Sequence, residues 1–173
     1  MTESKKTKKK RKPKSKLPKE FEQQIFKAFN EIPGVSIDRI PDQVTKYKGS
    51  SQNICDYLVY YKPTLYYIEC KTVHGNTLPF SNIRDNQWVG LSDKSKIPGV
   101  QAGVICWWVD HDVTLYLPIQ VLLQVASAGG KSVRYDIYSP LVPNDNGIIS
   151  IPGKKKRVYF DYDVSEFLEF TRD

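Results

Sequence analysis

The chain has 173 residues, of which 40% are hydrophobic and 26% are charged, and its net charge is +7. This length and composition are typical of one globular domain, and no run of roughly 20 apolar residues marks a membrane helix. No apolar segment of a secretory signal follows the N-terminus, and the three cysteines lie in predicted strands, so we expect a cytoplasmic protein with reduced, buried thiols.

The positive charge is concentrated at the N-terminus. Residues 1–20 carry ten Lys/Arg and two Asp/Glu, so the other 153 residues have a net charge of −1. Residues 1–17 are rich in Lys, Arg, Ser and Pro, and we expect a disordered basic tail there, followed by a single domain over residues 18–173. The tail is either a DNA-binding arm that gains affinity by releasing counterions or a solubilising segment. As an arm, it would contact DNA through Lys8, Lys9, Lys10 and Arg11.

A helix is predicted over residues 18–31, because proline is favoured in a first turn and apolar residues recur on one face. Glu22 lies near its start. One interpretation is a surface acid that compensates the helix dipole.

A first strand is predicted over residues 35–40. The connection over residues 41–53 carries Lys46 and Lys48. These two lysines are either DNA contacts or ordinary residues of a solvated loop.

Two strands are predicted over residues 54–60 and 65–70, both rich in β-branched and aromatic residues. Asp56 lies on the first of them, and Glu69 and Lys71 lie at the end of the second. Since side chains alternate along a strand, Glu69 and Lys71 share one face.

The turn at Lys62-Pro63 sets the register of this hairpin. We favour a four-residue loop that pairs Tyr60 with Leu65, because Pro63 cannot adopt the positive φ of a two-residue type I′ turn. A two-residue loop gives the same register, and both place Asp56 opposite Glu69 on one face.

Two carboxylates this close repel each other unless a divalent cation lies between them, and Mg²⁺ is typically held by one or two carboxylates. Lys71 adds a positive charge for a phosphate or a water. The alternative is a half-exposed hairpin with scattered surface charges, although its strands are unusually apolar for that.

The rest of the chain predicts alternating elements. Trp107 and Trp108 are adjacent in a strand and point to opposite faces, which indicates a sheet covered on both sides. The fold class is therefore α/β, with a mixed central sheet flanked by helices. The predicted elements are a helix over 82–96, strands over 103–109 and 113–117, a helix over 118–126, a strand over 158–160 and a C-terminal helix around 167–170.

Lys131 and Arg134 follow a glycine-rich loop and offer a small phosphate-binding patch. Gln87 lies in the first turns of the helix predicted over 82–96, where an ordinary surface glutamine is one interpretation. These polar residues complete the candidates that the sequence supplies.

The segment around the hairpin resembles the PD-(D/E)xK (restriction-endonuclease-like) nuclease core and, within it, the RecU-type Holliday-junction resolvases. The resemblance is strong over residues 53–88 and weaker over about 20–170. It is carried by Asp56, Glu69-Cys70-Lys71, Asn76-Thr77-Leu78-Pro79-Phe80, Asn82-Ile83 and Asp85-Asn86-Gln87.

This resemblance implies a Mg²⁺-dependent endonuclease, with Mn²⁺ as a possible substitute, that resolves Holliday junctions or other branched DNA in recombination and repair. It implies a homodimer from a phage or a Gram-positive bacterium. Asp56, Glu69 and the backbone carbonyl of Cys70 would hold the metal. Lys71 would orient the attacking water or stabilise the transition state, and Gln87 would lie at the scissile phosphate or a metal-bound water. In related nucleases an acid of the first helix reaches the site, which makes Glu22 an accessory candidate.

The family's connection after the first strand grows into a stalk that enters the junction, whereas residues 41–53 are short here. One alternative is therefore the same core acting on nicks, flaps or restriction-type sites. The other is a non-catalytic DNA-binding protein, against which the intact Asp56, Glu69 and Lys71 argue.

Overall fold

The computed structural model describes residues 16–41, 53–137, 147–157 and 159–171. Expectations about the N-terminal tail and about Lys46 and Lys48 lie outside these ranges. No helix in the described ranges is long and apolar enough to cross a membrane.

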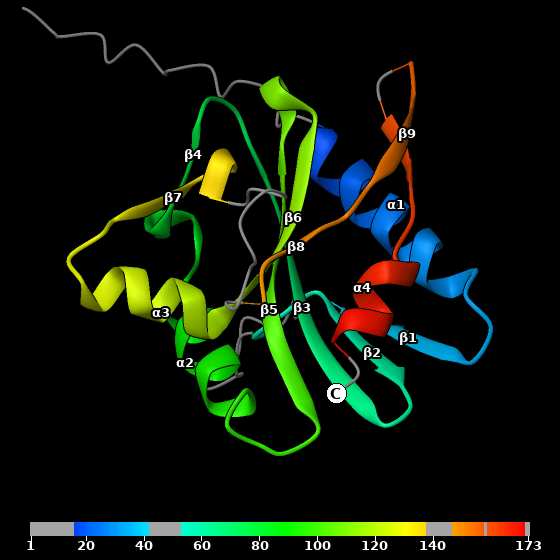
Figure 1. Ribbon diagram of the computed structural model, residues 1–173, viewed down its shortest axis with the longest axis horizontal. Helices are drawn as coiled ribbons and strands as arrows, with labels where there is room; N and C mark the ends of the chain where they lie inside the picture. Colours follow the sequence, from blue (N-terminus) through cyan, green and yellow to red (C-terminus); the bar gives the residue numbers. More distant parts are fainter. Residues whose placement is uncertain (1–15, 42–52, 138–146, 158, 172–173) are drawn as a thin grey trace, which may run out of the picture.

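The centre of the molecule is a six-stranded mixed sheet in the order β1-β2-β3-β5-β6-β8 (Figure 1). Only β3 and β5 pair in parallel among these strands, and the other neighbours are antiparallel. The prediction of a mixed α/β sheet is confirmed. The strands are β1 Val35–Arg39, β2 Tyr57–Tyr61, β3 Thr64–Val73, β5 Val100–Trp108, β6 Val113–Pro118 and β8 Ile149–Ser150.

Helices cover both faces of this sheet, with α1 and α4 on one side and α2 and α3 on the other (Figure 1). Trp107 is buried in the core beside α1 and α4, and Trp108 is buried in the core beside α2 and α3. The prediction that adjacent tryptophans serve two separate cores is therefore confirmed. The helices are α1 Leu17–Asn30, α2 Asp85–Lys94, α3 Ile119–Ser127 and α4 Ser165–Phe170.

Two small antiparallel sheets flank the central one. β4 (Thr77–Pro79) pairs with β7 (Ser132–Arg134), and β9 (Gly153–Lys156) pairs with β10 (Tyr159–Tyr162). Three short 3₁₀ helices complete the described elements: η1 Phe80–Asn82, η2 Val109–His111 and η3 Tyr135–Ile137.

The hairpin of β2 and β3 has the predicted register but a different turn. Tyr60 pairs with Leu65, as expected, and pairing continues to Tyr61 with Thr64, so the loop has two residues. The Lys62-Pro63 peptide is cis. A turn with cis proline at its third position is of type VI, in which proline needs no positive φ, so the reason given for a four-residue loop did not apply.

Other boundaries also shift. β2 begins at Tyr57, so Asp56 lies just before the strand, whereas β3 extends beyond Cys70 to Val73. α2 begins at Asp85, because Asn82 is the last residue of η1 and Ile83 and Arg84 are extended.

Candidate active site

The hairpin and the elements around it enclose a cavity of about 330 Å³. Asp56, Glu69, Cys70 and Lys71 line it together. The structure thus brings together the predicted pair of carboxylates and the predicted lysine. The remaining lining residues come from α1, β1, β3, η1 and their flanks: Pro18, Glu22, Arg39, Ile40, Thr72, Asn82 and Arg84.

Backbone hydrogen bonds hold Asp56 between two strands. Its N–H donates to the carbonyl of Ile68 at 3.0 Å, and the N–H of Ile40 donates to its carbonyl at 2.9 Å. The N–H of Cys70 donates to Asp56 Oδ2 at 2.8 Å. The Asp56 carboxylate is therefore fixed against β3, although the residue lies outside the strand.

Glu69 is an almost fully buried acid, with 2% of its surface exposed. Lys71 Nζ donates to Glu69 Oε1 at 2.5 Å, as expected for residues that share a strand face. Glu69 Oε2 is buried and has no hydrogen-bond partner among the described residues. Burial and then the nearby Asp56 carboxylate raise the pKa of Glu69 to about 7, although Lys71 and Gln87 act in the opposite direction.

Gln87 is 1% exposed, so the interpretation of an ordinary surface glutamine is wrong. Its Oε1 accepts hydrogen bonds from Lys71 Nζ at 3.3 Å and from the Arg84 N–H at 3.0 Å. One amide oxygen therefore caps the first turn of α2 and also contacts the lysine of the cavity.

Glu22 faces the cavity from α1 and is half-buried, which makes it more than a surface acid at a helix start. Arg39 Nη2 donates to Glu22 Oε2 at 3.3 Å. The acid from the first helix thus lies in the wall that also contains Asp56 and Glu69.

Sequence reasoning missed two cations of this cavity, Arg39 and Arg84. Arg39 ends β1, and Arg84 directly precedes α2. A single exposed arginine belongs to no repeating pattern, so its role cannot be predicted from periodicity. The one hint for Arg84 in the sequence is its position next to the Asp85-Asn86-Gln87 segment.

Lys131 and Arg134 lie elsewhere, at the small sheet of β4 and β7. Arg134 is bound by Asp136 through two hydrogen bonds, at 2.8 and 2.9 Å, so its charge is already paired. This pairing weakens the prediction of a phosphate patch at Lys131 and Arg134.

The cavity has donors suited to a hard divalent cation. No group of three or more His, Cys, Asp or Glu side chains in the described ranges is arranged to hold a metal. The predicted ligands are fewer: two carboxylates and one backbone carbonyl, which suits Mg²⁺ because it keeps several waters. Glu69 Oε2, which is buried and has no hydrogen-bond partner in the described part of the chain, fits such a cation, because an anionic oxygen in that position requires a positive partner.

No protein-family model and no curated protein sequence matches the chain. Among solved structures, the chain is similar to Hjc, a Holliday junction resolvase from the archaeal hyperthermophile Archaeoglobus fulgidus, with a TM-score of 0.41 and 20% sequence identity. The match covers 59% of this chain and 77% of that chain, and it is a similarity of fold alone.

Proposed function

We propose that the protein is a metal-dependent endonuclease of the PD-(D/E)xK type that cuts branched DNA such as Holliday junctions, as RecU-type resolvases do. The observation that carries this proposal is the cavity in which Asp56, Glu69 and Lys71 meet, where Glu69 Oε2 is buried and has no hydrogen-bond partner among the described residues. In metal-assisted phosphodiester hydrolysis, paired carboxylates can hold the metal and a lysine can stabilise the charge of the transition state.

Asp56, Glu69 and the backbone carbonyl of Cys70 would hold Mg²⁺, or Mn²⁺ in its place. When bound, the metal would polarise the scissile phosphate and lower the pKa of an attacking water. Glu22 lies in the same wall and would hold a water of the metal's outer coordination.

Lys71 would stabilise the charge that develops on the phosphate or orient the attacking water. Its ammonium is already directed by two acceptors, Glu69 Oε1 and Gln87 Oε1, so little reorganisation is needed when the substrate arrives. Gln87 is thus a positioning residue for Lys71. Arg39 and Arg84 add positive charge at the cavity, where the DNA backbone would pass.

The RecU-type resemblance further supports a homodimer, since a two-fold symmetric enzyme suits a junction that is itself two-fold symmetric. On this proposal the basic segment around Lys8, Lys9, Lys10 and Arg11, together with Lys46 and Lys48, adds DNA contacts that are not specific for sequence.

Cleavage of end-labelled DNA tests the proposal. A four-way junction, a flap, a nicked duplex and an intact duplex of the same sequence are each incubated with the protein in Mg²⁺ or in EDTA. Junction cleavage in Mg²⁺ that stops in EDTA and in Asp56→Asn is the expected result. Binding to all four DNAs without cleavage of any would contradict the proposal and leave a DNA-binding protein without catalysis.

The same core acting on another substrate is the second candidate. The connection between β1 and β2 is short, whereas in RecU-type resolvases it forms the stalk that enters the junction. Preferential cutting of the flap or the nicked duplex would favour this candidate.

A further inference from the structure

A second cavity, of about 570 Å³, lies at η1 and the first turn of α2. Arg84 lines both this cavity and the one that holds Asp56 and Glu69, so the two adjoin at that residue. This cavity is wide open to solvent, so a ligand there would lie against its wall and would not be enclosed by it.

Two aromatic rings form a corner in this cavity. Phe80 and Trp88 are both half-buried, with ring centroids 5.2 Å apart and planes at 80°. Each packs partly on the core beside α2 and α3. The rings are thus held at right angles by packing, which makes them a fixed platform for a flat, apolar ligand.

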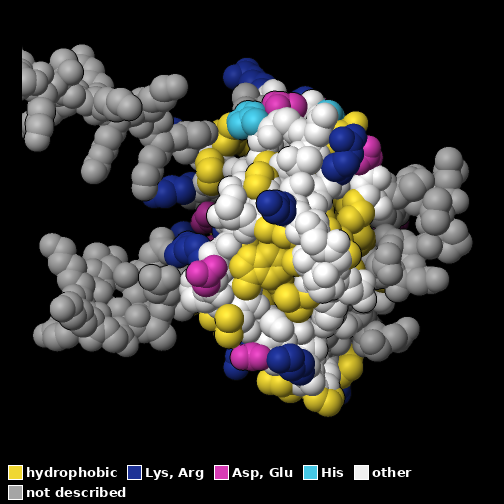
Figure 2. Space-filling model, turned by 90° about the vertical axis from the view of Figure 1, so that its left-hand side faces the viewer, with side chains coloured by type: hydrophobic (Ala, Val, Ile, Leu, Met, Phe, Trp, Pro, Cys, Tyr) yellow, Lys and Arg dark blue, Asp and Glu magenta, His cyan; other side chains and the backbone are white. Residues whose placement is uncertain are grey.

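The two helices on this side of the sheet, α2 and α3, have further exposed apolar side chains. Val89, next to Trp88, is 63% exposed, and Leu123 of α3 is 36% exposed. Figure 2 shows the face that holds α2 and α3, with hydrophobic side chains gathered near its middle and both basic and acidic side chains around them.

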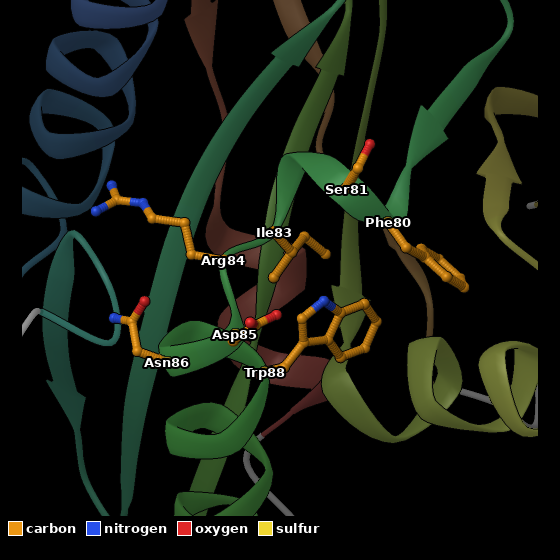
Figure 3. A pocket seen from close by; sticks show the side chains of 7 residues that line it. All are labelled: Phe80, Ser81, Ile83, Arg84, Asp85, Asn86 and Trp88. Carbon is orange, nitrogen blue, oxygen red and sulfur yellow. The ribbon is translucent and has the colours of Figure 1, made fainter.

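Polar residues at the start of α2 line the same cavity as the two rings. Asp85 and Asn86, from the first turn of α2, line the cavity together with the rings. In Figure 3 Arg84 points away from Phe80 and Trp88, toward the side of α1, while the Asp85 carboxylate lies near the indole of Trp88. The Phe80 N–H donates to the carbonyl of Lys131 at 2.9 Å, which holds the start of η1 against the segment before β7.

A flat ring with polar edges, attached to a phosphate, matches these features. We propose that the cavity lined by Phe80 and Trp88 binds one unpaired base of the DNA strand whose scissile phosphate would lie at the metal held by Asp56 and Glu69. The proposal rests on the proposed nuclease function, and it adds the substrate feature that the enzyme selects: an unstacked nucleotide next to the cut. A paired base within a duplex has both faces covered by its neighbours, whereas an unstacked base at a branch point has a face free for an aromatic ring.

The fluorescence of the protein itself reports on this cavity. Of the three tryptophans, all in the described ranges, Trp107 and Trp108 are 2% and 0% exposed, while Trp88 is half-buried. A base that stacks on Trp88 therefore quenches the one indole that a ligand can reach.

The test uses the full chain in EDTA, so that no DNA is cut, and three DNAs: a branched DNA with unpaired nucleotides at the branch, the same DNA with abasic sites at those nucleotides, and a fully paired duplex. We expect quenching by the first DNA, and roughly tenfold weaker binding with loss of quenching for the other two. Two matched variants, Trp88→Phe and Trp88→Leu, are compared by the fluorescence anisotropy of labelled DNA, which measures their affinity for each DNA. Trp88→Phe should keep the preference for the base over the abasic site, and Trp88→Leu, which keeps apolar bulk without a ring, should lose it.

Equal quenching and affinity for the abasic DNA would overturn the proposal, and so would an unchanged preference in Trp88→Leu. A dimer that becomes a monomer in Trp88→Leu by sedimentation would also overturn it, because the surface would then be a subunit interface. Base-dependent quenching without any cleavage in Mg²⁺ would uphold this cavity and reject the nuclease. Cleavage by the wild type, with equal binding of the base-containing and the abasic DNA, would uphold the nuclease and reject this cavity as a base-binding site.

Discussion

Replacing Glu69 by glutamine should change how the stability of the metal-free protein depends on pH. In the folded protein the carboxyl keeps its proton up to about pH 7, whereas its ordinary pKa is 4.5. Between these pH values folding takes up a proton, so the free energy of unfolding falls as pH rises through this window. Above pH 7 the folded protein bears the full free-energy cost of burying the ionised Glu69 carboxylate.

The magnitude follows from the pKa difference. Each unit corresponds to about 1.4 kcal/mol, so the rise from 4.5 to about 7 corresponds to roughly 3 kcal/mol. The side chain is only 3% exposed, so solvent screening reduces this value little. Glutamine has no proton to lose, and Glu69→Gln should therefore gain about 3 kcal/mol relative to the wild type between about pH 4.5 and about pH 8.

Urea denaturation in EDTA at several pH values measures this difference. Glu31→Gln, on an exposed side chain, controls for the substitution itself. Mg²⁺ should stabilise the wild type at about pH 8, where Glu69 is ionised, and should have little effect on Glu69→Gln. If the two proteins differ by the same free energy at every pH, the reasoning from burial is wrong.

Four further predictions concern the site and the tail. Asp56→Asn should fold and bind DNA but lose cleavage, which single-turnover assays would show; near wild-type rates would remove Asp56 from the metal site. Lys71→Ala should slow cleavage by on the order of 10²–10³ and keep Mg²⁺ binding, since a protonated lysine cannot be a metal ligand. Lys71→Arg should restore the cleavage rate only in part. If Lys71→Ala loses metal binding but cleaves normally at saturating Mg²⁺, the role assigned to Lys71 is wrong. Gln87→Leu should reduce the cleavage rate less than Lys71→Ala does, with an unchanged KM for DNA; a rise in KM alone would point to direct DNA contact. A chain that begins at Leu17 should show a shallower slope of log affinity against log salt, and an unchanged slope would leave the tail a solubilising segment.

The register of the β2–β3 hairpin could be predicted from the sequence, because residues close together in the chain determine it. Two apolar strands around Lys62-Pro63 allow only an even loop if Asp56 and Glu69 are to share a face, and both even loops give the same register. The length of the loop was mispredicted, because the peptide before Pro63 is cis, and nothing in the neighbouring residues marks that state.

The burial of Gln87 at the start of α2 could not be predicted from the sequence. Whether Gln87 faces solvent or Lys71 depends on how α2 crosses from β3 to β5, which is a tertiary property. Arg39 and Arg84 were missed for a similar reason: they come from different elements and meet at one cavity only after folding.

The shared acceptor at Gln87 links the site to the backbone of α2. Its Oε1 is divided between the ammonium of Lys71 and the N–H of Arg84, so a substrate that attracts Lys71 leaves that oxygen to the amide alone. Hydrogen exchange at the Arg84 amide should then slow when the site is occupied, since a stronger hydrogen bond protects it. A single amide proton would thus report, without any label on the DNA, whether the catalytic lysine is engaged.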